Sequence, residues 1–424
     1  MDKNRNLYWL NYEVIEKRLM NLTVLKKLKE GEFYLLILNV YIFIQVFSES
    51  QLNEMAIIGD ILYGLRIILL CILAVQAFLF IDWKNIRYLT VCKIFAFLFA
   101  LFCIINTCFR NGGQNLLGLF LLVVVSRGKS LKKILKNTLV SMCLSHGIVL
   151  GLCLCGILYD DVAVRWIGNQ TGAFFSGEYV RHAFGFLHSN QLPLAFMLMV
   201  FLYVAVRAEK FTVAETILIA VINYLLFDFC GSRISLILVV AFLLCFWYIR
   251  NCPKSIRQKT NWIVIGYFVY PFAFIISLVS AYAYRESGGF WDYLNLIFNN
   301  RLIYAHKLLN VYPFSFLGYG KYAGTYNGLG EATADNGYVV MLLQAGFILS
   351  IMIILLHEYI MHICIKKKCT ILVLCLSFVA IENLINAHMP SYKLLPLYCI
   401  LVNSHDVFLD SSKWLNRKKT WRFR

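Results

Sequence analysis

Residues 181–190 read RHAFGFLHSN and place one arginine, two histidines and an asparagine directly ahead of an apolar run. Arg181 presents a planar fork of hydrogen-bond donors that suits phosphate oxygens, and it keeps its charge where water is scarce. His182, His188 and Asn190 add polar groups beside it. This pattern predicts an anion-binding site at the mouth of a membrane helix. The structural alternative is that Arg181 and the histidines only anchor the loop among lipid headgroups.

Two further arginines stand at the starts of predicted helices. Arg233 lies in GSR, which opens an apolar run, and Arg301 opens RLIYAHKLLN, a short amphipathic helix that Pro313 should end. Arginine is unusual on the less basic side of a membrane, so the presence of Arg233 there needs a reason. Arg233 either forms an ion pair with Asp228 or is a second phosphate ligand.

Carboxylates follow in the same region of the chain. Glu331 and Asp335 lie close together, and Asp335 opens DNGY immediately before an apolar run. An aspartate in this place can cap the helix as its N-cap residue. A carboxylate at a membrane entrance can equally act as a general base. We take Asp335 as the first candidate base, with Glu331 and His188 next.

The composition indicates a membrane protein. Apolar residues make up 60% of the 424 residues, well above the roughly half that is usual for soluble domains. The net charge of +17 follows the loops along the chain and does not form one patch, so it predicts membrane topology and no nucleic-acid partner. The cysteines are spread through apolar segments, and neither DxD nor HExxH occurs. We expect neither a metal nor another cofactor.

The apolar runs predict an all-α, polytopic fold with about twelve (ten to twelve) transmembrane helices in a single membrane domain, residues 33–408. Residues 1–32 should form a cytoplasmic amphipathic arm, and residues 409–424 a basic cytoplasmic tail. Most Lys and Arg residues fall in alternate loops, which predicts both termini inside and two long extracytoplasmic loops, 160–190 and 285–336. The predicted spans are 33–47, 57–81, 89–109, 115–125, 138–159, 191–206, 213–229, 234–249, 262–284, 337–360, 370–385 and 394–408.

These motifs resemble those of a known family. RHAFGFLHSN, GSR at a helix start, RLIYAHKLLN with LGYG after it, and DNGY opening a helix resemble the Wzy-type O-antigen and capsular polysaccharide polymerases, relatives of the O-antigen ligases. Ser189 stands where many of these proteins have proline. Asp335 stands where the ligase branch has histidine, which favours a polymerase.

The resemblance implies a membrane glycosyltransferase in the bacterial cytoplasmic membrane. Its substrate would be an oligosaccharide repeat unit on polyprenyl diphosphate, with a flippase and a chain-length regulator as pathway partners. Arg181, Arg233 and Arg301 would stabilise the diphosphate leaving group. Sugar-binding residues would be His182, Asn190, Tyr304, Asn336 and Tyr338. The alternatives are a ligase-type glycan transferase and a repeat-unit transporter or flippase, for which broken helices and ionisable groups near the bilayer centre would be expected.

Overall fold

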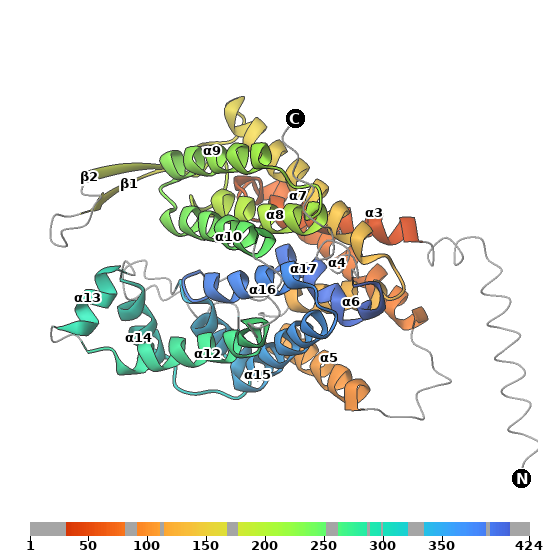
Figure 1. Cartoon of the computed structure of the whole chain (residues 1–424). Helices are drawn as coiled ribbons and strands as arrows, with labels where there is room; N and C mark the ends of the chain where they lie inside the picture. The colour runs from red at the N-terminus through yellow and green to blue at the C-terminus, as the bar shows by residue number, and fades with distance from the viewer. Residues whose placement is uncertain are drawn as a thin grey trace, which may run out of the picture.

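The computed structural model describes residues 31–80, 91–110, 114–167, 177–251, 262–285, 289–297, 300–320, 335–386 and 391–407. Most of these residues are helical, as predicted. Figure 1 shows the long helices lying roughly side by side, with a β-hairpin and two short helices projecting at one end. We call this end the hairpin end. The opposite end, where residues 126–133 and 366–370 connect helices, is called the basic end.

The longer helices of the bundle follow the predicted apolar runs, except that α7 begins seven residues before the predicted run 138–159 and ends five residues before its end. They are α3 (Gly31–Ser48), α4 (Ala56–Phe80), α5 (Val91–Arg110), α7 (Leu131–Leu154), α8 (Gln191–Arg207), α9 (Val213–Cys230), α10 (Arg233–Asn251), α12 (Trp262–Ala283) and α15 (Gly337–Lys366). The shorter elements are α6 (Gln114–Val125), α13 (Phe290–Ile297), α14 (Arg301–Val311), α16 (Thr370–Glu382) and α17 (Leu395–Tyr398), with the 3-10 turns η1 (Gln51–Asn53), η5 (Tyr392–Leu394), η6 (Cys399–Leu401) and η7 (Ser404–Asp406).

Length and hydropathy identify a membrane protein. Six helices within the described residues are long and apolar enough to cross a bilayer: Ala56–Leu79, Leu131–Leu154, Val213–Cys230, Arg233–Asn251, Ile265–Ala283 and Gly337–Lys366. Six further apolar helices are shorter. Twelve complete spans are therefore not confirmed. At 1.5 Å per residue, the 12 residues of α6 extend about 18 Å, less than the roughly 30 Å of the hydrocarbon core.

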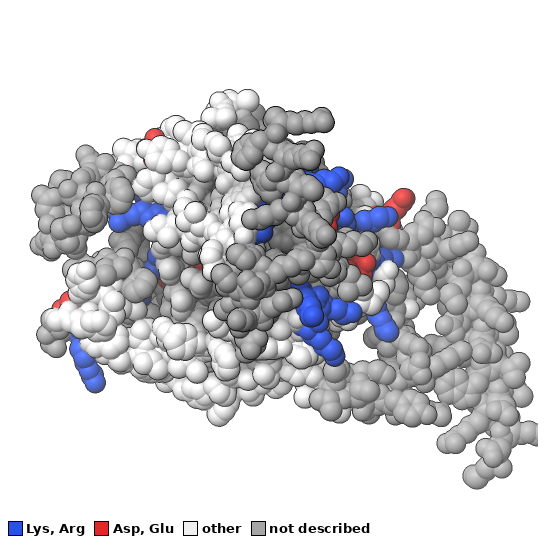
Figure 2. All heavy atoms as spheres, viewed as in Figure 1, with Lys and Arg blue, Asp and Glu red and all other residues white. Residues whose placement is uncertain are grey.

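Surface composition agrees with a bilayer around the bundle. Large apolar side chains are exposed on its outside, among them Ile57, Phe97, Ile217 and Leu244. In Figure 2 most coloured charged atoms lie toward the two ends of the molecule, and the described surface visible between them is mainly white. Inside, Phe201 of α8, Phe242 of α10 and Phe378 of α16 pack together with ring centroids 4.3 to 6.0 Å apart. These contacts join three helices into one core.

The loop 160–190 contains an antiparallel hairpin that the all-α prediction did not include. Strand β1 (Val162–Ile167) pairs with β2 (Gly177–His182), and the register sets Ala163 opposite Arg181. The hairpin delivers Arg181 to the hairpin end of the bundle. The predicted arm 1–32 and tail 409–424 lie outside the described residues, apart from the first two residues of α3.

Helix α15 is broken at Gly346, whose φ of 82° and ψ of 171° are far from helical values. The segment that follows α14 fills the break. Tyr319 N donates to Leu343 O at 2.7 Å, and Gly320 N donates to Gln344 O at 3.1 Å. Irregular backbone at membrane depth is stable only where protein satisfies it in this way. A Cβ on Gly346 would lie 2.3 Å from Gly318 N, so glycine is required for this close approach.

Candidate functional site

Arg181 is buried at the hairpin end, where its side chain forms hydrogen bonds with two helices. It is 7% exposed, its Nε donates to Cys230 O at 2.8 Å, and its Nη2 donates to Asn190 Oδ1 at 2.5 Å. It thus connects β2, the start of α8 and the end of α9. Gly231 ends α9 with φ of 66°, and a Cβ there would lie 3.0 Å from Arg181 Nε. Glycine lets the turn lie directly against the guanidinium.

Arg233 begins α10 two residues after this turn and is partly buried. The sequence left open whether it pairs with Asp228. The structure has no such ion pair, and Asp228 is exposed. Across the described ranges, Arg233 has no hydrogen-bond or ion-pair partner. The turn between α9 and α10 therefore carries the Arg233 cation close to Cys230, whose carbonyl oxygen accepts a hydrogen bond from Arg181 Nε.

The two histidines of the motif have local structural contacts. His182 Nδ1 and Asp160 Oδ2 are 2.6 Å apart, and the other carboxylate oxygen of Asp160 accepts a hydrogen bond from Phe184 N at 2.7 Å. His188 is exposed, and its Nδ1 accepts a hydrogen bond from Asn190 N at 3.1 Å. Asp160 thus fixes the base of the hairpin, whereas His188 presents much of its ring to the surroundings.

The centre of the motif fastens to the end of α3. Gly185 O accepts a hydrogen bond from Gln51 N at 2.9 Å, and Leu187 N donates to Glu49 O at 3.1 Å. Gly185 has φ of 79°, and a Cβ there would meet Leu158 and Cys153 at 3.1 to 3.2 Å. These contacts bring residues 181–190 against residues far earlier in the chain.

Arg301 and Asp335 form a second group. Arg301 Nε donates to Asp335 Oδ2 at 3.2 Å, and its Nη2 lies 3.5 Å from Asn386 Oδ1. The Arg301 side chain is 10% exposed and that of Asp335 is 42% exposed. The arginine is therefore buried beneath an accessible carboxylate. Gly337 N donates to Asn383 O at 2.9 Å, which holds the start of α15 against the end of α16.

Three predicted sugar-binding residues can be placed near this group. Asn336, and not Asp335, is the N-cap of α15, because its Oδ1 accepts from Tyr338 N and Val339 N. Tyr338 is fully buried and donates its hydroxyl to Ala380 O at 3.0 Å. Both side chains are buried and have structural contacts, and their role in sugar binding stays a prediction. Tyr304 lies partly buried on α14, and Glu331 falls outside the described residues.

A buried charge centre was not singled out from the sequence. Lys393 Nζ donates to Glu49 Oε2 at 2.8 Å, and Tyr392 OH donates to the same oxygen at 3.1 Å. Glu382 is 1% exposed and lies within electrostatic reach of both Lys393 and Arg301. The available signal was a lysine in the apolar segment SYKLLPLYC and an acid at the end of an apolar run.

These contacts decide which predicted residues meet. Arg181, Asn190 and the turn that carries Arg233 form one group, and Arg301 with Asp335 forms another. Glu49, Lys393 and Glu382 connect the two, because Glu49 contacts the motif and Glu382 lies near Arg301. Arg181 and Arg301 thus belong to different contact groups, and a clamp formed by all three arginines stays a prediction.

No group of three metal-ligating side chains occurs among the described residues. Comparison of the chain with protein-family models, curated proteins and solved structures finds no match. Any functional interpretation therefore depends on the contacts and exposure of these residues. The geometry provides a cation without a described partner, a half-exposed carboxylate held by an arginine, and an exposed histidine, all at one end of an apolar bundle.

Proposed function

We propose that the chain is a membrane glycosyltransferase that joins polyprenyl-diphosphate-linked oligosaccharide repeat units. The observation that carries the proposal is Arg233 at the start of α10, without a partner among the described residues and next to the turn that Arg181 braces. A guanidinium at the bilayer boundary is suited to a lipid-linked diphosphate, because both charges lie where water is scarce. Arg181 acts as a positioning residue, since its donors already hold the turn and Asn190.

Charge compensation explains how the cations would accelerate transfer. The bond between the anomeric carbon and the diphosphate oxygen breaks, and negative charge develops on the leaving diphosphate. A donor placed in advance at this charge stabilises the transition state without reorganising. Removing one such donor costs about 3–4 kcal/mol, or roughly 10²–10³ in rate.

The Arg301–Asp335 pair supplies the second half of the reaction. Asp335 accepts the proton of the acceptor hydroxyl while that oxygen forms the new bond to the anomeric carbon. Arg301 holds the carboxylate from the buried side and leaves it 42% exposed toward substrate. A general base must lie within hydrogen-bond reach of the hydroxyl, and a half-exposed carboxylate meets this condition. His188 is the alternative base on the first group.

Orientation follows from the distribution of basic residues. The basic end would face the bacterial cytoplasm and the hairpin end the outer face, with both termini inside. Repeat units would then reach the site after a flippase has moved them across the membrane. A chain-length regulator of the same pathway is a further proposed partner.

Chain growth by purified protein in detergent tests this proposal, because detergent removes any need for translocation. Protein is supplied with lipid-linked repeat units, and product length is read on a gel. Arg233→Ala should reduce transfer by about 10²–10³. Arg285→Ala, which removes an exposed arginine at the same end, is the matched control. Equal chain growth by both variants would remove the basis for the proposal.

A repeat-unit transporter is the second candidate function. The broken helix α15 and the buried Lys393 and Glu382 support it, because transporters use discontinuous helices and buried ionisable groups. Movement of labelled repeat units across proteoliposomes, with no chain growth in detergent, would favour the transporter. Chain growth in detergent would favour the polymerase.

A further inference from the structure

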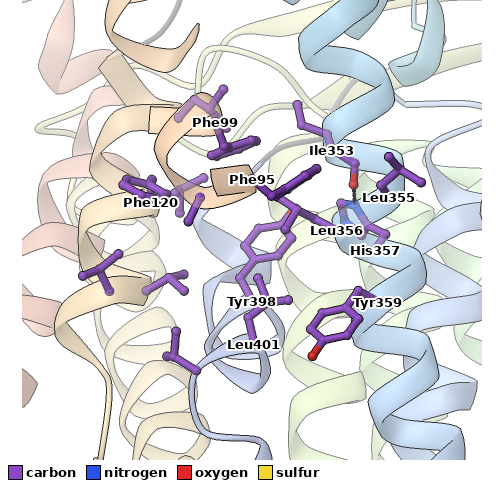
Figure 3. A pocket seen from close by; sticks show the side chains of 16 residues that line it. Phe95, Phe99, Phe120, Ile353, Leu355, Leu356, His357, Tyr359, Tyr398 and Leu401 are labelled. Atoms are coloured by element: carbon purple, nitrogen blue, oxygen red, sulfur yellow. Dashed lines mark hydrogen bonds between the residues drawn. The ribbon is translucent and has the colours of Figure 1, made fainter. Parts of the chain in front are cut away.

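An apolar cavity of about 460 Å³ lies between α5, α6, α15 and the segment of α17 and η6. Figure 3 shows the aromatic side chains that line it, with Phe95 and Phe99 on one side, Phe120 beside them and Tyr398 below. The size lies within the usual range of small-molecule sites. The wall is mainly hydrocarbon and aromatic, and its polar groups are the ring of His357 and the hydroxyls of Tyr359 and Tyr398. A cavity with so apolar a lining suits a hydrocarbon chain.

Short elements produce this cavity. Helix α6 has 12 residues, and the segment from Tyr392 to Leu401 has one α-helical turn between two 3-10 turns. Neither is long enough to cover the neighbouring faces of α5 and α15 through the full hydrocarbon thickness. In a bilayer, the remaining space is filled most favourably by a lipid chain.

The cavity lies toward the basic end. Its lining on α6 reaches Val124, three residues before Arg127, and its lining on η6 continues into Val402. The next residue, Asn403, accepts a hydrogen bond from Gly128 N at 2.8 Å and donates to Ser126 O at 3.0 Å. The turn of residues 126–130 is thus fastened to the cavity wall.

Basic residues lie on or next to two of the elements that line the cavity, toward the basic end. Arg127 is exposed and Lys129 is half-buried on the fastened turn. On α15 the lining reaches Tyr359, and Lys366 follows about 10 Å further along the helix at the basic end. Burial lowers the pKa of Lys129, so a nearby anion would favour its charged form.

We propose that this cavity binds one acyl chain of an anionic phospholipid, whose headgroup phosphate rests on Arg127, Lys129 and Lys366. The chain supplies the apolar contact, and the three cations supply the preference for negative charge. Basic pockets between membrane helices are suited to such headgroups. The site lies at the opposite end from the proposed catalytic groups and does not rest on the proposed function.

Photo-crosslinking in nanodiscs tests the occupant. The full-length protein is placed in phosphatidylcholine nanodiscs that contain phosphatidylglycerol or phosphatidylcholine with a diazirine on one acyl chain, and crosslinked peptides are mapped by mass spectrometry. Phosphatidylglycerol should label α5, α6 and α15 around the cavity more strongly than phosphatidylcholine. Equal labelling by the two lipids would overturn the headgroup assignment.

Substitutions that fill the cavity provide a second test of the proposal. Val124→Trp should reduce labelling of these helices severalfold, because the indole occupies the space of the chain. Val75→Trp is the matched control, since Val75 is exposed on α4 and does not line the cavity. Val402→Phe gives an independent filling variant should Val124→Trp fail to fold. Undiminished labelling in a folded filling variant would contradict the site.

Charge removal separates the headgroup from the chain. Arg127→Gln with Lys366→Gln should weaken phosphatidylglycerol labelling by roughly fivefold for each residue, equivalent to about 1 kcal/mol, and leave phosphatidylcholine labelling unchanged. Lys136→Gln with Lys210→Gln removes the same charge from exposed positions elsewhere near the basic end. The proposal fails if both pairs have the same effect, or if polyprenyl phosphate displaces the label better than phosphatidylglycerol does.

Discussion

The ion pair between Glu49 and the buried Lys393 allows a specific prediction about stability. The Lys393 side chain is 0% exposed, whereas that of Glu49 is 29% exposed. Glu49→Gln leaves a buried ammonium without its carboxylate, a change that typically costs about 3–5 kcal/mol. We expect about 3 kcal/mol, because Glu382 remains within electrostatic reach of Lys393.

The reverse substitution should cost less. Lys393→Met leaves the carboxylate of Glu49, but water reaches that side chain and Tyr392 OH still donates to it. A cost of about 1–2 kcal/mol is expected. The double variant should be no less stable than Lys393→Met alone, because both partners of the ion pair are then absent and neither is left without the other. The two single changes are therefore non-additive by about 3 kcal/mol or more.

Denaturant-induced unfolding in mixed micelles measures these differences. Glu54→Gln is the matched control, since Glu54 is exposed in the same connection after α3. If Glu49→Gln loses no more unfolding free energy than Glu54→Gln, or if Lys393→Met costs more than Glu49→Gln, the assignment of the buried charge to Lys393 is refuted.

Three further substitutions test the geometry. Gly346→Ala should lower the free energy of unfolding by about 3 kcal/mol or more in the same assay. A φ of 82° would be strained for alanine, and its Cβ would lie 2.3 Å from the backbone nitrogen of Gly318. Gly337→Ala should cost about 1–3 kcal/mol, since its Cβ would lie 2.6 Å from Asn386 O; Gly64→Ala, with open space, should be neutral, and equal thermal shifts for both would contradict this. Asp335→Asn should slow chain growth by about 10²–10⁴ while keeping a side-chain oxygen that can accept from Arg301 Nε, and unchanged turnover in the folded variant would transfer the base role to another residue.

Helices were the most predictable part of the fold. The run 213–229 became Val213–Cys230, and the run 57–81 became Ala56–Phe80. An apolar segment in a bilayer must satisfy its own backbone, and a helix does so with local hydrogen bonds alone. Helix ends were likewise marked locally, as in the capping box of Thr212 with Glu215.

Non-local elements were not predictable in the same way. Residues 394–408 suggested one span, but the structure has a single α-helical turn among 3-10 turns. The break at Gly346 depends on Tyr319 and Gly320, which supply its hydrogen bonds from a separate segment. The β1–β2 pairing similarly requires two strands to find each other. None of these partners is encoded by local hydropathy.

The sequence alone determined the class of molecule, the position of most helices and the residue types available for anion chemistry, because these depend on composition and on neighbours along the chain. Only the tertiary structure decided the partners. It placed Arg181 against Cys230 O, paired Arg301 with Asp335, and joined Glu49 to Lys393 across 344 residues. Such contacts depend on how helices pack, and side-chain packing between distant segments leaves no periodic signal in the chain.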